Sequence, residues 1–442
     1  MSSYKRRPSP GDTEWFVRDR FGMFIHFGLY AMPARHEWVK NFESIPEDQY
    51  DRYFRHFDPD LFDARQWAKT ARESGMKYAV LTTKHHEGFC LFDSAYTNYK
   101  ITNTPFKRDL VKEYADAFRA EGLKVGFYYS LIDWHHPQFP IDIHHPRRHD
   151  ENAAELDRGR DMTKYAAYMR DQVRELLTNY GKIDILWFDF SYAPSEKYAA
   201  FQFSGGKGKD QWESEKLIGL ARSLQPGIII NNRSGVEQDL YTPEQYQPND
   251  WVRHPETGEY VTWEACQTFS GSWGYHRDES SWKSPETLIN LLVNTVSLGG
   301  NLLMNVGPTS RGVFDPRAEK ALKVYGDWMR FNSRSIYGCT MAEPEFSTPA
   351  GCRLTQREDG SRLYIHLQTY PFKHLAFEGL DPQRVDYAQF LQDGSEVKFK
   401  PLTQKTDSIN RGRESLPDKP STVFSLPAIQ PGLCPVIELF LK

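Results

Sequence analysis

The sequence predicts an α/β fold in which a (β/α)8-like TIM barrel is followed by a C-terminal antiparallel β-sandwich. From residue 20 to 329, short apolar runs alternate with stretches of helical spacing, which is typical of parallel strands joined by helical crossovers. One run ends in Asp189, and barrels hold their functional groups at the carboxyl ends of strands. The helical spacing then gives way to short alternating stretches, so we expect a barrel domain at 1–338 and a sandwich domain at 339–442.

Six apolar or β-rich runs are expected to form barrel strands: Gly22–Phe27, Tyr78–Thr82, Val125–Ser130, Ile183–Phe188, Gly227–Ile230 and Leu302–Val306. Between them, Asp109 and Ser284 are helix start signals, and Gly75, Gly122 and Gly181 are stop signals. A doubly wound dinucleotide-binding sheet is the alternative. It needs GxGxxG after its first strand, whereas the glycine-rich segment from 204 to 208 is a polar loop with no strand before it.

The last hundred residues have the pattern of antiparallel strands. Asp359-Gly360 and Asp393-Gly394 turns separate short alternating stretches such as Arg362–Leu367 and Val397–Phe399. Such turns between alternating runs predict hairpins, and several hairpins in succession predict a sandwich.

The composition is that of a globular protein without a polyanionic partner. Hydrophobic residues make up 39% and charged residues 26% of the 442 residues, and the net charge is -4, which argues against nucleic acid. No segment approaches the roughly 18 apolar residues of a membrane span, and none follows the basic N-terminus, so we expect no membrane partner and a cytoplasmic location. Five cysteines without a CxxC pair predict neither a zinc site nor a disulfide framework. A homo-oligomer is left open.

Polar side chains follow several of the predicted strands. They are His26; His85, His86 and Glu87; Tyr128, Tyr129, Asp133 and Trp134; Asp189; and Asn231, Asn232 and Arg233. Because parallel strands end at the same rim of a barrel, these residues predict a polar pocket there. Adjacent residues on a strand point to opposite faces, so one of Tyr128 and Tyr129 lines the pocket while the other packs behind it.

Three functions fit these residues. A metal-dependent barrel hydrolase would use as ligands His26, His85, His86 and Asp189, although the first strand carries His-Phe-Gly rather than the His-x-His of such enzymes. A glycoside hydrolase would pair Asp189 with Glu244 or Glu264, and the apolar neighbours of Glu264 favour the raised pKa of an acid. A non-catalytic sugar-binding protein is the third function, and the intact carboxylates argue against it.

Longer strings, in the same order along nearly the whole chain, define a more specific pattern. They are Phe21–Tyr30, Glu37-Trp38, Thr83–Ser94, Gly126–Ser130, Leu186–Asp189, Thr242–Glu244, Trp263-Glu264, Ser272–Tyr275 and Gly299–Pro308. Together they resemble glycoside hydrolase family 29, the α-L-fucosidases. The combination is far more specific than any one string.

The resemblance implies an exo-acting retaining enzyme that hydrolyses terminal α-L-fucosyl residues of fucosylated oligosaccharides or glycoconjugates, with no metal or organic cofactor. It implies Asp189 as the nucleophile and Glu244 as the acid/base, with Glu264 in reserve. The residues expected around the fucose are His26, Glu37, Trp38, His85, His86, Tyr129, Arg233, Glu264 and Trp273. Phe190-Ser191 departs from the family, in which many members have glycine. The sequence does not decide the linkage, the aglycone or the role of the His135–His149 loop.

Overall fold

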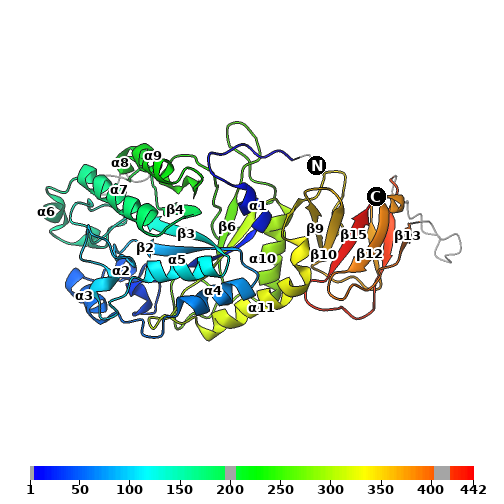
Figure 1. Ribbon diagram of the computed structural model, residues 1–442, viewed down its shortest axis with the longest axis horizontal. Helices are drawn as coiled ribbons and strands as arrows, with labels where there is room; N and C mark the ends of the chain where they lie inside the picture. The colour runs from blue at the N-terminus through cyan, green and yellow to red at the C-terminus, as the bar shows by residue number, and fades with distance from the viewer. Residues whose placement is uncertain (1–3, 195–205, 403–418) are drawn as a thin grey trace.

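The first part of the chain forms one parallel sheet surrounded by helices (Figure 1). The computed structural model describes residues 4–194, 206–402 and 419–442, so part of the glycine-rich loop falls outside the described residues. The strands of this sheet are β1 (Phe21–Ile25), β2 (Tyr78–Lys84), β3 (Lys124–Ser130), β4 (Ile185–Asp189), β5 (Ile229–Ile230), β6 (Glu264–Thr268) and β7 (Asn301–Val306). Their order is β5-β4-β3-β2-β1-β7-β6, and the six expected strands are all among them.

A short segment between β5 and β6 joins the two edges of this sheet. The backbone N–H of Asn232, just after β5, donates to the carbonyl of Leu240 at 2.9 Å. On the other side, the N–H groups of Glu264 and Cys266 in β6 donate to the carbonyls of Tyr241 and Pro243 at 2.9 and 3.0 Å. Pro243 has no N–H to give, so the pairing is limited to isolated bridges. The predicted TIM-like barrel is therefore closed by the segment 240–244 in place of a regular eighth strand.

The sequence did not predict β6, although all five of its residues are buried. Its residues are Glu-Ala-Cys-Gln-Thr, without the apolar run that marks a buried parallel strand. Glu264, Gln267 and Thr268 are buried polar residues instead. This strand is held by its neighbour β7, with Ala265 paired to Leu302, and not by its own hydrophobicity.

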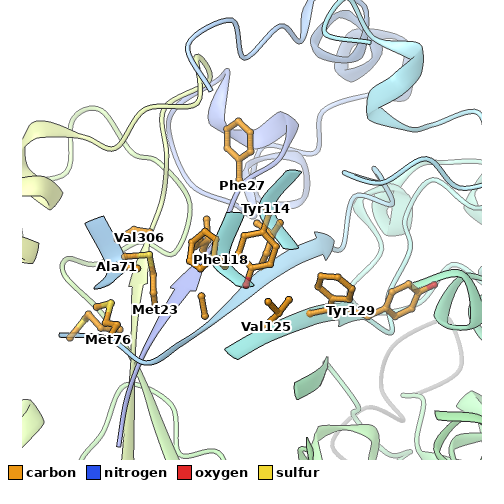
Figure 2. Close-up of a cluster of buried hydrophobic side chains, with 14 of the residues drawn as sticks. Met23, Phe27, Ala71, Met76, Tyr114, Phe118, Val125, Tyr129 and Val306 are labelled. Carbon is orange, nitrogen blue, oxygen red and sulfur yellow. The ribbon is translucent and has the colours of Figure 1, made fainter. Parts of the chain in front are cut away.

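Side-chain alternation divides the strand residues between the barrel interior and the helix layer. Phe24, Tyr128 and Trp187 belong to one buried cluster inside the barrel. Their neighbours pack outward against the helices, as Figure 2 shows for Met23, Val125 and Tyr129. Because this period of two holds across paired strands, residues from β1, β3 and β4 share the inner face.

Helices cover the sheet, and the two predicted start signals and three predicted stop signals coincide with helix ends. The helices are α1 (Glu14–Asp19), α2 (Val39–Phe42), α3 (Glu47–His56), α4 (Ala64–Glu73), α5 (Leu110–Ala120), α6 (Ala153–Asp157), α7 (Met162–Asn179), α8 (Lys209–Trp212), α9 (Ser214–Leu224), α10 (Pro285–Ser297) and α11 (Pro316–Asn332). Asp109 caps α5 by accepting from the N–H of Lys112, and Ser284 caps α10 by accepting from the N–H of Thr287. Gly75, Gly122 and Gly181 follow helix ends with φ of 84°, 76° and 74°, as helix stop signals do.

The C-terminal part consists of two antiparallel sheets, as the sequence predicted (Figure 1). One contains β8 (Cys339–Met341), β9 (Cys352–Arg357), β10 (Arg362–Leu367), β12 (Val385–Phe390) and β15 (Val436–Leu441), and the other β11 (His374–Phe377), β13 (Phe399–Pro401) and β14 (Thr422–Ser425). Side chains from both sheets, including Leu363 and Phe424, form one buried cluster. The expected stretch Val397–Phe399 only overlaps β13.

A buried arginine joins the barrel to these sheets. Arg20, directly before β1, donates from Nε to the carbonyl of Cys339 at 2.8 Å and from Nη1 to the carbonyl of Gly299 at 2.7 Å. The junction therefore lies at the amino end of β1, away from the rim where the strands end. In the described residues, no helix is both long and apolar enough to cross a bilayer.

Replacing Gly22 by alanine should destabilise the protein. A Cβ at this position in β1 would overlap the ring of Tyr78, which is buried and held by a hydrogen bond to Glu264. Overpacking of this kind costs about 1 to 3 kcal/mol, measurable as a lower free energy of unfolding in urea. Gly219→Ala is the matched control, because nothing lies near its added methyl in α9 and a helical alanine should gain about 0.5 to 1 kcal/mol. Equal stability of the two variants would contradict this account.

Candidate active site

A cavity lies at the rim where the barrel strands end. It is lined by Phe24, His26, Glu37, Trp38, His85, His86, Tyr128, Trp187, Asp189, Phe190, Arg233, Glu244, Cys266 and Trp273. Its volume is about 80 Å³, well below the ~300–1,000 Å³ of pockets for drug-sized ligands. The cavity therefore suits a single sugar ring rather than a chain of sugars.

Asp189 ends β4 and is held from two sides. Its Oδ1 accepts from Nη1 of Arg233 at 2.9 Å, and its Oδ2 accepts from the hydroxyl of Tyr128 at 2.9 Å. The side chain is 15% exposed. Both oxygens are thus fixed in direction while the carboxylate still faces the cavity.

Arg233 connects Asp189 to the second carboxylate of the cavity, Glu244. The same Nη1 that donates to Asp189 at 2.9 Å also donates to Oε2 of Glu244 at 2.7 Å. The two carboxylate oxygens are therefore no farther apart than these two hydrogen bonds laid end to end. Retaining glycosidases hold their carboxyl groups about 5 to 5.5 Å apart. The guanidinium itself is fixed by Thr242, whose hydroxyl accepts from Nε at 2.9 Å, and by the ring of Trp187, whose centroid lies 4.6 Å away.

Glu264, the other expected partner of Asp189, lies deeper in the barrel and does not line the cavity. Its two oxygens accept from the hydroxyl of Tyr78 at 2.5 Å and from Nε1 of Trp187 at 3.2 Å. Burial raises its pKa to about 7. Of the two candidate glutamates, the structure brings Glu244 to Asp189, and Glu244 is 40% exposed at the open side of the cavity.

Hydrogen bonds behind the cavity fix which nitrogen of His26 and His86 carries the proton. Asn305 donates its amide N–H to the carbonyl of Trp273, so its oxygen accepts from Nδ1 of His26 at 2.6 Å. Ser130 donates to the carbonyl of Ile132, so its oxygen accepts from Nδ1 of His86 at 2.7 Å. In a neutral ring the Nε2 atom is then an acceptor.

Burial keeps these imidazoles uncharged. It lowers the pKa of His26 to about 3 and the pKa values of His85 and His86 well below their ordinary value. The rings of His85 and His86 are adjacent, with centroids 4.0 Å apart, and both line the cavity because β2 ends at Lys84 and the chain turns there. Neutral acceptors of this kind match sugar hydroxyl donors.

Glu37 supports the part of the cavity wall that contains Trp273. Its Oε2 accepts from the backbone N–H groups of Trp273 and Gly274 at 3.1 and 2.9 Å, and burial raises its pKa to about 7. The indole of Trp273 lies 5.1 Å from the ring of His26 and 5.9 Å from that of Phe24. This wall therefore combines a buried carboxylate with a flat apolar face.

The expectation for Tyr129 is corrected by the structure, which places Tyr128 in the cavity. Tyr129 points outward from β3, and its hydroxyl donates to the side-chain oxygen of Gln172 in α7 at 2.8 Å. The alternation that puts Phe24 and Trp187 inside the barrel also puts Tyr128 there. Strand alternation could have identified Tyr128. Trp187 lies two residues before Asp189 and so shares its face of the sheet, and Tyr128 pairs with Trp187 on the neighbouring strand.

The metal-hydrolase alternative is not supported by the positions of its proposed ligands. Among the described residues, one group could share an ion, namely Glu47, Asp51 and His135, and none of these lines the cavity. Both oxygens of Asp189 are engaged by Arg233 and Tyr128 instead.

The His135–His149 loop packs beside the segment that follows β4. The ring of His144 lies 4.9 Å from Phe190 and 4.7 Å from Tyr192. Asp142 of the loop, which is fully buried, accepts from the hydroxyl of Tyr192 and forms an ion pair with Lys207. The loop thus supports one side of the cavity.

A parallel barrel whose cavity pairs two carboxylates beside neutral hydrogen-bonding side chains defines a glycoside hydrolase of the retaining class. The family model described as Alpha-L-fucosidase matches residues 2–334. The chain belongs to the α-L-fucosidase family.

Similar proteins agree with this assignment. Human plasma alpha-L-fucosidase is 33% identical over 353 residues, which cover 73% of this chain and 68% of that protein. The structure of alpha-L-fucosidase isoenzyme 1 from Paenibacillus thiaminolyticus is similar with a TM-score of 0.87 at 45% identity, covering 97% of this chain and 98% of the other. A GH29 alpha-L-fucosidase from Bacteroides thetaiotaomicron, trapped as a covalent intermediate with 2-fluoro-fucosyl fluoride, gives 0.80 at 28% identity, covering 100% and 99%.

Glu264→Gln should make stability less dependent on pH. The pKa of Glu264 is raised from 4.5 to about 7 in the folded protein, so the stability contributed by its neutral form is present below pH 4.5 and is lost as the pH rises through 7. A glutamine stays neutral, accepts from Trp187 and donates to Tyr78. From pH 5 to pH 8, the free energy of unfolding measured in urea should fall by about 1 to 3 kcal/mol more in the wild type than in the variant. The exposed control Glu256→Gln should show no such gain, and parallel pH profiles for Glu264→Gln and wild type would refute the assignment.

Proposed function

We propose that the protein is an exo-acting retaining α-L-fucosidase in which Asp189 is the nucleophile and Glu244 is the acid/base. One observation supports this assignment: Nη1 of Arg233 binds an oxygen of each carboxylate and so keeps the two within the reach that double displacement needs. The substrate is a terminal α-L-fucosyl residue of an oligosaccharide or glycoconjugate. The small cavity accepts that residue alone, which makes the enzyme exo-acting.

In the first step, an oxygen of Asp189 attacks C1 of the fucose while Glu244 gives its proton to the departing glycosidic oxygen. The bond from C1 to that oxygen breaks, and an ester between C1 and Asp189 forms. In the second step Glu244 removes a proton from water, the water oxygen attacks C1, and the ester bond breaks to restore the Asp189 carboxylate. Two inversions at C1 give net retention.

The remaining cavity residues position the sugar. His26, His85 and His86 offer neutral ring nitrogens to the hydroxyl groups, and Glu37 and Trp38 complete this side. Trp273 presents its flat face to the apolar edge of the ring and its C6 methyl group. Arg233 and Tyr128 hold Asp189 in its line of attack, since a nucleophile fixed near its target lowers the entropic part of the barrier.

We also propose that the catalytic domain ends at residue 338 and the sandwich domain begins at residue 339. Gly338 has a φ of 65° directly before β8, and a separate buried cluster runs from Ala342 to Leu439. The cytoplasmic location stays a prediction. It is supported by five cysteines that are all free and buried, as is usual in a reducing compartment.

Labelling should identify Asp189 as the nucleophile. A 2-deoxy-2-fluoro-fucosyl fluoride should form a stable ester that peptide mass mapping locates at Asp189. The fluorine at C2 slows both steps, and the good fluoride leaving group keeps only the first step fast, so the ester accumulates. Asp189→Gly should lower kcat by about 10⁴-fold or more while the protein remains folded. The exposed control Asp278→Gly should retain full activity, and wild-type activity should survive exhaustive chelation. A label on another side chain, or a product of inverted configuration, would overturn the mechanism.

Azide should distinguish the acid/base from the buried glutamate. Glu244→Ala leaves space at the open side of the cavity, so azide should attack the fucosyl-enzyme and restore turnover of an aryl fucoside, with a fucosyl azide of retained configuration as product. Glu264→Ala is the matched control, and it should show no rescue because Glu264 does not line the cavity. Rescue of the Glu264 variant alone would reverse the assignment.

A further inference from the structure

Aromatic side chains form one side of the mouth of the cavity. Phe42 is 66% exposed at the end of α2, and its ring is stacked on that of Trp38 with a centroid distance of 5.9 Å and an angle of 26°. Trp38 lines the cavity and lies 5.1 Å from the ring of Phe190. We call these three residues, Phe42, Trp38 and Phe190, the aromatic rim. It continues the cavity wall outward to solvent.

The backbone of Phe190 is strained. Its φ is 75°, a left-handed conformation that costs a non-glycine residue about 1 to 2 kcal/mol. The strain is maintained by its surroundings, because Tyr192 and Lys207 both bind the buried carboxylate of Asp142 just beyond it. Strained residues concentrate where a side chain serves a ligand, and here the strain keeps a phenyl ring in the cavity wall.

We propose that the aromatic rim binds the sugar that carries the fucose, that is, the first sugar of the aglycone. This inference rests on the proposed function. The cavity has room for one ring, so the next sugar must lie at its mouth, where Phe42 exposes an aromatic face. Pyranose rings present C–H faces whose apolar area a flat aromatic ring removes from water. Phe42 itself does not line the fucose cavity, so it acts on the aglycone only.

Two substrates that share the fucose and differ in the leaving group test the proposal. With α-L-fucosyl fluoride the leaving group has no ring to stack. With a fucosyl disaccharide, taken as the linkage to galactose or N-acetylglucosamine that the wild type cleaves fastest, the aglycone sugar is present. Phe42→Ala should lower kcat/KM on the disaccharide by about 5- to 10-fold and leave kcat/KM on the fluoride unchanged. Phe42→Trp should restore the disaccharide value.

The controls separate this role from a structural one. Phe372→Ala removes another exposed phenyl ring, 77% exposed in the C-terminal part, and should change neither substrate. A Phe42→Ala variant that loses activity equally on both substrates has a damaged cavity, and one that loses activity on neither has no aglycone contact at Phe42. Either result overturns the proposal. Failure of the proposed function itself would be recognised separately, as a wild type that cleaves neither the fluoride nor any disaccharide.

Discussion

The ion pairs of Arg233 with Asp189 and Glu244 are the interaction on which the site depends. One guanidinium nitrogen donates both to a carboxylate at the end of β4 and to a carboxylate of the closing segment 240–244, and so keeps the two close together. Two like charges held this close would repel each other without a cation between them. Arg233 is in turn fixed by the hydroxyl of Thr242 and the ring of Trp187. The distance between the two carboxylates is therefore limited by side chains of the barrel wall itself.

The barrel interior serves the site as well as stability. Phe24, Tyr128 and Trp187 fill the inner face and at the same time form part of the cavity lining. Trp187 also donates to Glu264 below the cavity. A residue at these inner positions thus belongs to both the packed core and the cavity lining, which leaves little freedom for substitution.

Most of the fold followed from the sequence, because apolar runs and helix caps are local signals. β6 did not, since its buried polar residues Glu264 and Gln267 are held by pairing with β7 and not by hydrophobicity. The pairing of Asp189 with Glu244 was expected from family resemblance, whereas the choice of Tyr128 over Tyr129 required the strand alternation to be followed into the barrel. The position of Phe42 beside Trp38 depends on the course of the loop after β1, which no local pattern specifies.

The segment that closes the barrel has a further consequence for how the family diversifies. Residues 240–244 pair with β5 and β6 only through isolated bridges, so changes of length there disturb few backbone hydrogen bonds, while Asp189 belongs to a regular strand. Changes in this segment can therefore move Glu244, the proposed acid/base, toward leaving groups of different shape without moving Asp189, the proposed nucleophile. The closing segment 240–244 is therefore the part of the barrel whose length can change with little disturbance to the rest.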